Sequence, residues 1–73
     1  MNNCLKEALN MMQYHIDRNS PNILLIFDND YLKRNYMETI KEKNTNEICI
    51  STNDLCYTNT LSGLKFKAFY FMR

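Results

Sequence analysis

Five consecutive apolar residues constrain the fold of this chain more than any other feature: Ile23, Leu24, Leu25, Ile26 and Phe27. The short run, with turn-forming residues on both sides, favours a strand over a helix. A strand in which apolar and polar side chains do not alternate is buried on both faces, which is typical of a parallel sheet covered by helices. This run therefore predicts an α/β fold built around a central strand.

A helix is expected on each side of this strand in the sequence. The spacing of apolar residues predicts a helix over residues 3–17, begun by Asn2 or Asn3 and ended before Pro21. Asp28 or Asn29 is expected to cap a second helix, which ends near Asn44. The helical positions that predict the two apolar faces are Leu5, Ala8, Leu9, Met12 and Ile16 in the first helix, and Leu32, Tyr36 and Ile40 in the second.

Two further strands complete the prediction. Residues 47–51 form a short strand, and residues 64–72 form a third strand after a turn at Gly63, the only glycine. Alternation in the third strand predicts Leu64, Phe66, Ala68, Tyr70 and Met72 on one face, and Lys65, Lys67, Phe69 and Phe71 on the other. On this pattern the strand changes from half-exposed to wholly buried along its length.

The expected architecture is a single small α/β domain over residues 1–73, in the order α-β-α-β-loop-β. It has a three-stranded, mostly parallel sheet and two helices, and the strand–helix–strand unit implies a right-handed crossover. A domain this short buries only ~60% of the surface that its unfolded chain exposes. Such small folds often need a disulfide, a bound metal ion or a partner chain for stability.

Cysteine and histidine usage predicts no metal or cofactor. The three cysteines, Cys4, Cys49 and Cys56, form no CxxC pair, and His15 is the only histidine. A structural zinc site would need four suitably spaced ligands. Association with a second copy or another protein is the remaining way to gain stability.

Charge and hydropathy limit the partners. A net charge of +1 argues against a strongly basic nucleic-acid clamp and against an acidic nucleic-acid mimic. The longest apolar run is far short of the ~20 residues that span a bilayer, and the N-terminal residues enter an amphipathic segment rather than a secretory signal. We therefore expect no membrane partner and a cytoplasmic location, with the cysteines as thiols.

Amino-acid usage suggests an origin. Asparagine occurs 11 times, while glycine and proline occur once each. Asn, Lys and Ile have AT-rich codons, so this usage indicates an AT-rich genome, such as that of a phage or a low-GC bacterium.

Three segments share an order with a known family: a strand ending in Phe27-Asp28-Asn29, a strand ending in Ser51-Thr52, and a turn from Leu61 to Lys67 that leads into an apolar strand. In this order the chain resembles the middle of the P-loop ATPase core of phage terminases and helicase-like proteins. The chain lacks a GxxxxGKS or GxxxxGKT phosphate loop, and Met72-Arg73 stands where that family has an acidic pair. The resemblance therefore implies a degenerate fold without ATPase activity.

Other chemical candidates have structural alternatives. His15 and Asp17 point to different faces of a helix, so a structural histidine is preferred to an acid–base pair. Cys56 lies in a loop without any feature that predicts a lowered pKa, and Cys49 is expected in the core.

Acidic residues follow the first strand. Asp28, Asn29 and Asp30 come at the strand's carboxyl end, where ligands bind in open α/β sheets. A magnesium site there and simple capping of the second helix are both open, and capping is preferred.

The C-terminal segment supplies the function hypothesis. Lys65, Lys67, Tyr70 and Arg73 could form a small surface for nucleic acid, but lysines on an edge strand also prevent unwanted sheet pairing. The aromatic side chains exceed what two helices can cover, which indicates contact with a partner. The expected protein-binding residues are Tyr57, Lys65, Phe66, Lys67, Phe69, Tyr70 and Phe71.

The sequence thus predicts a non-enzymatic protein-binding accessory protein, encoded by a phage or mobile element, that binds and modulates or inhibits a host or defence protein. Self-association through residues 66–71 is also expected to be possible. A nucleic-acid-binding accessory protein is the alternative, and a small enzyme using Cys56 or the Asp28 cluster ranks last.

Overall fold

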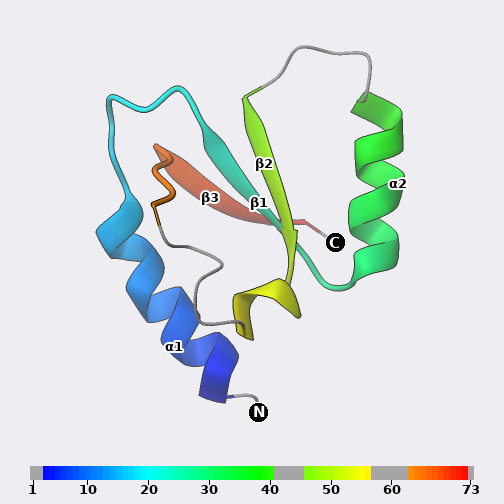
Figure 1. Cartoon of the computed structure of the whole chain (residues 1–73), viewed down its shortest axis with the longest axis horizontal. Coiled ribbons are helices and arrows are strands. Elements are labelled where there is room, and N and C mark those ends of the chain that lie inside the picture. The colour runs from blue at the N-terminus through cyan, green and yellow to red at the C-terminus, as the bar shows by residue number, and fades with distance from the viewer. Residues whose placement is uncertain (1–2, 41–45, 57–62, 73) are drawn as a thin grey trace.

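The computed structural model of the chain describes residues 3–40, 46–56 and 63–72. Three parallel strands, β1 (Ile23–Phe27), β2 (Glu47–Ser51) and β3 (Ala68–Met72), form a sheet in the order β2-β1-β3. The two helices are α1 (Asn3–Met12) and α2 (Asp30–Ile40). The α/β prediction with a three-stranded sheet and two helices is confirmed, and the sheet is parallel throughout (Figure 1).

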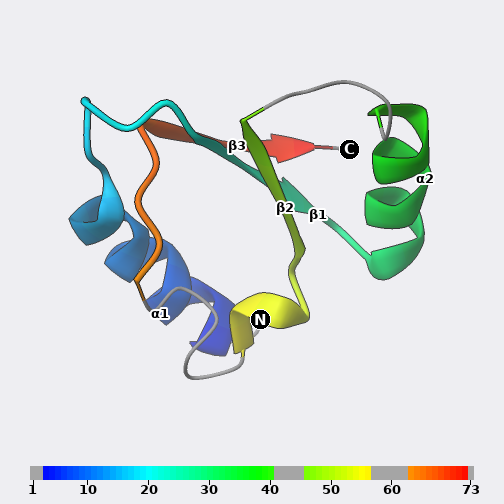
Figure 2. The ribbon, with the colours of Figure 1, turned by 45° about the horizontal axis from the view of Figure 1, so that its top comes forward.

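The central strand β1 is buried on both faces, as its sequence predicts. The helices α1 and α2 lie on opposite sides of the sheet (Figure 1 and Figure 2). Leu24 and Ile26 belong to the core on the α1 side, while Phe27 lies against Tyr36 of α2 with ring centroids 5.4 Å apart. The non-alternating run thus serves two apolar layers at once.

The larger apolar layer lies on the α1 side of the sheet. Its buried members are Met12, Leu24, Ile26, Ile50, Leu55 and Phe66. They come from α1, from β1 and β2, from the short 3-10 helix η2 (Asp54–Cys56) that follows β2, and from the segment before β3. This core therefore joins segments from both ends of the chain.

The first helix is shorter than expected. After α1 the chain forms a 3-10 turn, η1 (Gln13–His15), and Ile16 is already extended with ψ of 126°. The reason is backbone pairing: Phe66 N donates to His15 O at 3.3 Å, and Asp17 N donates to Phe66 O at 2.9 Å. These bonds align Ile16 with Phe66 in an isolated parallel bridge, which a continued helix would prevent.

The expected face pattern of residues 64–72 is confirmed from Ala68 to Met72 but is wrong before Ala68. The regular strand starts only at Ala68, after a bend at Lys67. Phe66 is fully buried and meets Phe69 edge to face at 6.2 Å on the α1 side, whereas Tyr70 lies beside Leu25 on the α2 side. The bend shifts the alternation, so Phe66 and Tyr70 face opposite sides of the sheet.

The expected burial of β3 is also wrong at its C-terminal half. Helix α2 packs on β1 and β2 rather than on β3, so Tyr70, which faces the α2 side, remains exposed. Phe71 faces the other side of the sheet and is exposed as well. Gly63, in contrast, occupies the expected turn, with φ of +77°. Neither helix of the described segments has the length and apolar character to cross a membrane.

Candidate functional site

Strand β3 forms one edge of the sheet. Among the residues that the structure describes, it pairs within the sheet only with β1, so the other side of Ala68–Met72 presents backbone groups without a partner in those segments. Tyr70 is 53% exposed and Phe71 is 47% exposed, and as neighbours in a strand they point to opposite faces. We call this side of the sheet, with Lys65, Lys67, Tyr70 and Phe71, the β3 edge.

Not all the residues expected to bind a partner are available. Lys65, Lys67, Tyr70 and Phe71 are exposed. Phe66 is a core residue and is removed from the candidate set, and Phe69 is half-buried against the same core. Tyr57, Arg73 and the expected helix cap Asn44 lie outside the described residues.

Three cations gather at the amino-terminal end of β3. Arg18 lies in a turn that is fastened to the segment before β3, because Ser20 Oγ donates to Lys65 O at 3.1 Å and Lys67 N donates to Asn22 O at 2.8 Å. Arg18, Lys65 and Lys67 are all exposed, and within residues 3–40, 46–56 and 63–72 none of them forms an ion pair. We call these three residues the basic corner.

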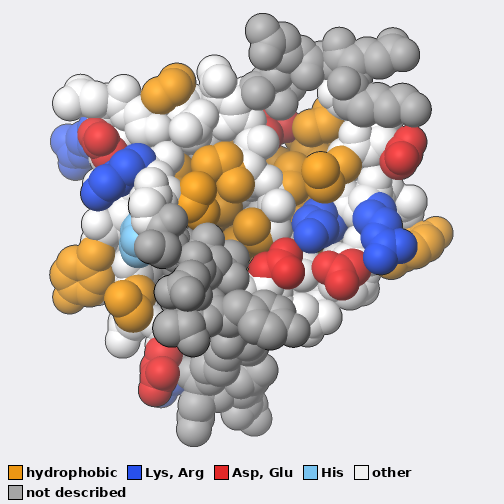
Figure 3. Space-filling view, viewed as in Figure 1, with side chains coloured by type: hydrophobic (Ala, Val, Ile, Leu, Met, Phe, Trp, Pro, Cys, Tyr) orange, Lys and Arg blue, Asp and Glu red, His pale blue; other side chains and the backbone are white. Residues whose placement is uncertain are grey.

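The loop that contains Arg18 lies at the upper left of Figure 1, and Figure 3 shows basic side chains with an acidic one in that region. Sequence reasoning missed Arg18, because residues 18 and 65 come together only through the backbone pairing of the two loops. The polar Asn19-Ser20-Pro21 turn was the only available signal.

His15 and Asp17 have structural contacts instead of a shared site. His15 Nδ1 lies 3.0 Å from Leu64 O, and the imidazole stacks on Phe66 at 6.3 Å. Asp17 Oδ1 accepts a hydrogen bond from Asn19 N at 2.9 Å, which closes the turn. Both residues therefore fix the loops that build the basic corner.

A second group of polar residues lies where β1 and β2 end, at the carboxyl-terminal ends of the strands. Lys33 Nζ lies 3.1 Å from Asp54 Oδ2 and 3.8 Å from Asp30 Oδ1. Ser51 N donates to Asp54 Oδ2 at 3.0 Å. That backbone hydrogen bond, followed by Lys33, holds the pKa of Asp54 below its ordinary value, against the opposing effect of burial.

Within the expected acidic cluster, the side chains of Asn29 and Asp30 and the backbone carbonyl of Asp28 have structural contacts. Asn29 Oδ1 accepts from Leu32 N at 2.9 Å and so caps α2, while Thr52 Oγ1 donates to Asp28 O at 2.9 Å. Among the described residues no group of three or more His, Cys, Asp or Glu is placed to hold a metal ion. Of the two interpretations, capping of α2 is the one with a direct contact, the hydrogen bond from Leu32 N to Asn29 Oδ1.

A second polar contact lies between α2 and β2. Tyr36 Oη donates to Glu47 Oε1 at 2.6 Å. This bond, with burial, raises the pKa of Tyr36 to about 12. Burial also raises the pKa of the nearby Cys49 thiol, with Glu47 adding to it and Lys33 opposing it, so Cys49 is half-buried but not an activated thiol.

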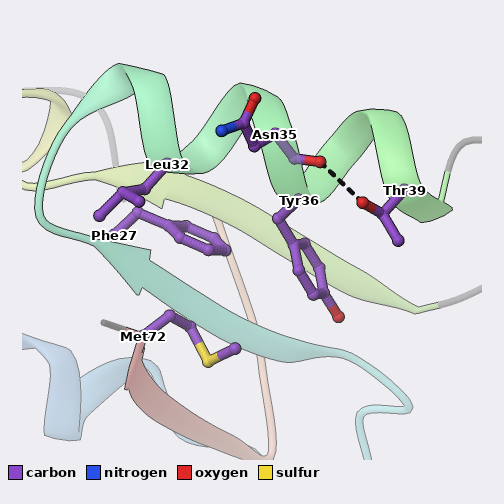
Figure 4. Close-up of a pocket in the computed structure, with 6 residues that line it drawn as sticks. All are labelled: Phe27, Leu32, Asn35, Tyr36, Thr39 and Met72. Carbon is purple, nitrogen blue, oxygen red and sulfur yellow. Dashed lines mark hydrogen bonds between the residues drawn. The ribbon is translucent and has the colours of Figure 1, made fainter.

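An open groove of about 260 Å³ separates α2 from the carboxyl ends of β1 and β3. Phe27 and Met72 lie on the sheet side, and Leu32 and Tyr36 face them from α2 (Figure 4). The polar wall consists of Asn35 and Thr39, whose hydroxyl donates to Asn35 O at 2.9 Å. Because Met72 belongs to β3, the groove lies next to the β3 edge.

Comparison with family models, curated proteins and solved structures finds no match for this chain.

Proposed function

We propose that this chain is a non-enzymatic protein-binding domain that takes an extended segment of another protein along the β3 edge. The observation that supports this most is that the edge strand exposes an aromatic side chain on each face, Tyr70 on one and Phe71 on the other. An added strand forms main-chain hydrogen bonds to an open edge and alternates its own side chains across both faces. One added strand would therefore cover both aromatic side chains.

The same observation argues against nucleic acid as the partner. Bases stack on aromatic side chains that share one continuous surface. Tyr70 and Phe71 point to opposite sides of the sheet, so they offer no such surface. With a net charge of +1 the chain as a whole offers little long-range attraction to a phosphate backbone, so such attraction is confined to the basic corner.

The proposal also includes the kind of protein that is bound and the source of the chain. A phage or mobile element as the source is suggested by the amino-acid usage, and a host or defence protein as the target by that usage together with the small size, the exposed apolar side chains and the absence of a recognised catalytic motif from the sequence. The absence of a phosphate-loop motif from the sequence supports a role without nucleotide hydrolysis. A cytoplasmic location follows from the same expectations.

The test is capture of a partner by matched variants. Chain bearing Tyr70→Glu and Phe71→Glu is compared with wild type and with a control bearing Tyr14→Glu and Tyr31→Glu, which changes two exposed aromatic residues outside the sheet. Captured proteins are identified by mass spectrometry, and a purified candidate is then added to the chain while amide hydrogen exchange is measured. We expect a protein that wild type and control retain and the edge variant loses, with slowed exchange in β3.

The proposal is wrong if the edge variant, shown to be folded by circular dichroism, captures the same proteins as wild type. It is equally wrong if the purified partner slows exchange only in segments away from β3. A complex that forms with a single-stranded oligonucleotide and persists at physiological salt would favour the nucleic-acid alternative.

A further inference from the structure

The two ends of the β3 edge differ in chemistry. The amino-terminal end has the basic corner, and residues 63–72 include two lysines and no acidic residue. The carboxyl-terminal end has Tyr70 and Phe71 and lies next to the groove lined by Met72. A strand that runs along this edge therefore passes from a cationic environment to an apolar one.

We infer that the segment bound at the β3 edge has acidic residues at one end and a large apolar anchor at the other. This inference rests on the proposed function and specifies its partner. The acidic side chains lie beside Lys65 and Lys67, and the apolar anchor enters the groove between Met72 and α2.

Charge is the first argument for an acidic end. Arg18, Lys65 and Lys67 form no ion pair among the described residues, and they outnumber Asp17, the acidic residue of that loop. Exposed like charges next to an open edge oppose a strand of the same sign and attract one of the opposite sign. An acidic segment thus gains attraction that a neutral one lacks.

The groove is the argument for the apolar anchor. Its volume of about 260 Å³ exceeds that of a cavity of about 150 Å³ that holds a benzene ring. Phe27, Leu32 and Met72 provide apolar walls, while Tyr36 has its hydroxyl engaged by Glu47. A Leu, Met or Phe side chain would remove water from these walls without leaving a polar group unpaired.

The strand geometry sets the spacing. Lys67 and Met72 are five positions apart in the sequence, and an added strand advances at about the same 3.3 Å per residue as the strand it joins. The acidic residue and the apolar anchor are therefore about five positions apart. Acid precedes anchor if the added strand is parallel to β3, and follows it if antiparallel.

A second copy of this chain fits the edge less well. Pairing of two β3 edges would be antiparallel by symmetry, and it would place the lysines of each copy beside the carboxyl end of the other β3. Within β3 that end has Tyr70, Phe71 and Met72 and no acidic residue, so the strand directly opposite the lysines of each copy would offer them no opposite charge. An acidic segment of a different protein satisfies both ends of the edge.

The experiment is selection of peptides from a random display library against the purified full chain. We expect selected peptides to have Asp or Glu about five positions from a Leu, Met or Phe. A double variant, Lys65→Glu with Lys67→Glu, should weaken the selected peptides by roughly tenfold or more. The control, Lys6→Glu with Arg34→Glu, makes the same charge change at exposed helical sites and should leave affinity unchanged.

Changes to the peptide test each end separately. Replacing its acidic residues by amides should weaken binding to wild type but not to the Lys65→Glu, Lys67→Glu variant, and raising the salt concentration should weaken it in the same way. Replacing the anchor by Ser should weaken binding to both. Filling the groove with Thr39→Trp should mimic loss of the anchor.

The possible results distinguish failure of this inference from failure of the proposed protein-binding function. Peptides that slow amide exchange in β3 but show no acidic preference, or bind the lysine variant as well as wild type, overturn the inference and leave the protein-binding proposal standing. A library that yields no peptide acting on β3 counts against both. Sedimentation of the chain alone as a dimer that the Tyr70→Glu, Phe71→Glu variant disrupts would identify a second copy as the occupant and also overturn the inference.

Discussion

At Gly63 the backbone has φ of +77°, a conformation that residues with a Cβ atom rarely adopt. No atom lies within 4 Å of the position where a Cβ would be, so the effect of substitution is backbone strain alone. Gly63→Ala should lower the free energy of unfolding by about 1–2 kcal/mol. Gly63→Asn should cost less, because Asn tolerates the left-handed region. Urea unfolding of the three proteins measures this, and equal losses for Ala and Asn would show that the turn changes its conformation.

Asp54 makes stability depend on pH. Its pKa is lowered in the folded chain by the Ser51 amide and then by Lys33, so the folded state holds a proton less readily than the unfolded state. The stabilisation is present above the unfolded value of about 3.9 and is lost as pH falls through the lower folded value. We expect Asp54→Asn to reduce the melting temperature at pH 7, and the difference from wild type to shrink below about pH 4. Asp28→Asn, an exposed aspartate at the same edge, is the control, and the same profile for both variants would contradict the prediction.

Helix α2 depends on its cap. It has no fully buried residue, so packing contributes less to it than to β1, and Asn29 Oδ1 satisfies the Leu32 amide at its start. Asn29→Ala should destabilise the chain by about 1 kcal/mol, while Asn29→Asp keeps an acceptor and should be nearly neutral. Thermal unfolding by circular dichroism distinguishes the two. If Asn29→Ala unfolds at the wild-type temperature, the hydrogen bond contributes nothing to the helix.

Elements with a clear local pattern could be predicted from the sequence, and elements that depend on distant pairing could not. The run Ile23 to Phe27, the strand at residues 47–51 and the turn at Gly63 are where their sequences indicate. The end of α1 and the start of β3 are displaced because His15, Asp17 and Phe66 pair across the fold. That pairing leaves no trace in the periodicity of either segment.

The candidate site shows the same limit. Tyr70 and Phe71 were expected to bind a partner and are exposed, but Phe66 was assigned to the same surface and lies in the core. The bend at Lys67 that separates them changes which face each side chain occupies, because a shift of one residue reverses the faces of a strand. Arg18 lies near Lys65 and Lys67 because the two loops pair through their backbones, and no local sequence pattern indicates that pairing.

At the scale of the whole molecule, charges of both signs lie at each end of the strands. The basic corner lies at the amino-terminal end of the sheet, where Asp17 shares the loop of Arg18 and Glu47 begins β2. Asp28, Asp30 and Asp54 lie at or just beyond the carboxyl-terminal ends of β1 and β2, where Lys33 pairs with Asp30 and Asp54. The proposed attraction of an acidic segment therefore rests on the three exposed cations beside the β3 edge and not on a charge difference between the two ends of the sheet.

Because the chain is small, its stability depends strongly on the larger apolar layer on the α1 side of the sheet. At about 0.05–0.15 kcal/mol per residue, 73 residues give a free energy of unfolding of roughly 4–11 kcal/mol. Phe66 is fully buried and joins the loop before β3 to α1, β1 and β2, and replacing such a residue by Ala costs about 3–5 kcal/mol. Phe66→Ala should therefore remove a large share of the free energy of unfolding, while Tyr70→Ala, at an exposed position on the other face, should change stability by less than about 1 kcal/mol. Urea titration followed by circular dichroism measures both, and similar losses for the two would mean that Tyr70 belongs to a core and that the β3 edge is not an open surface.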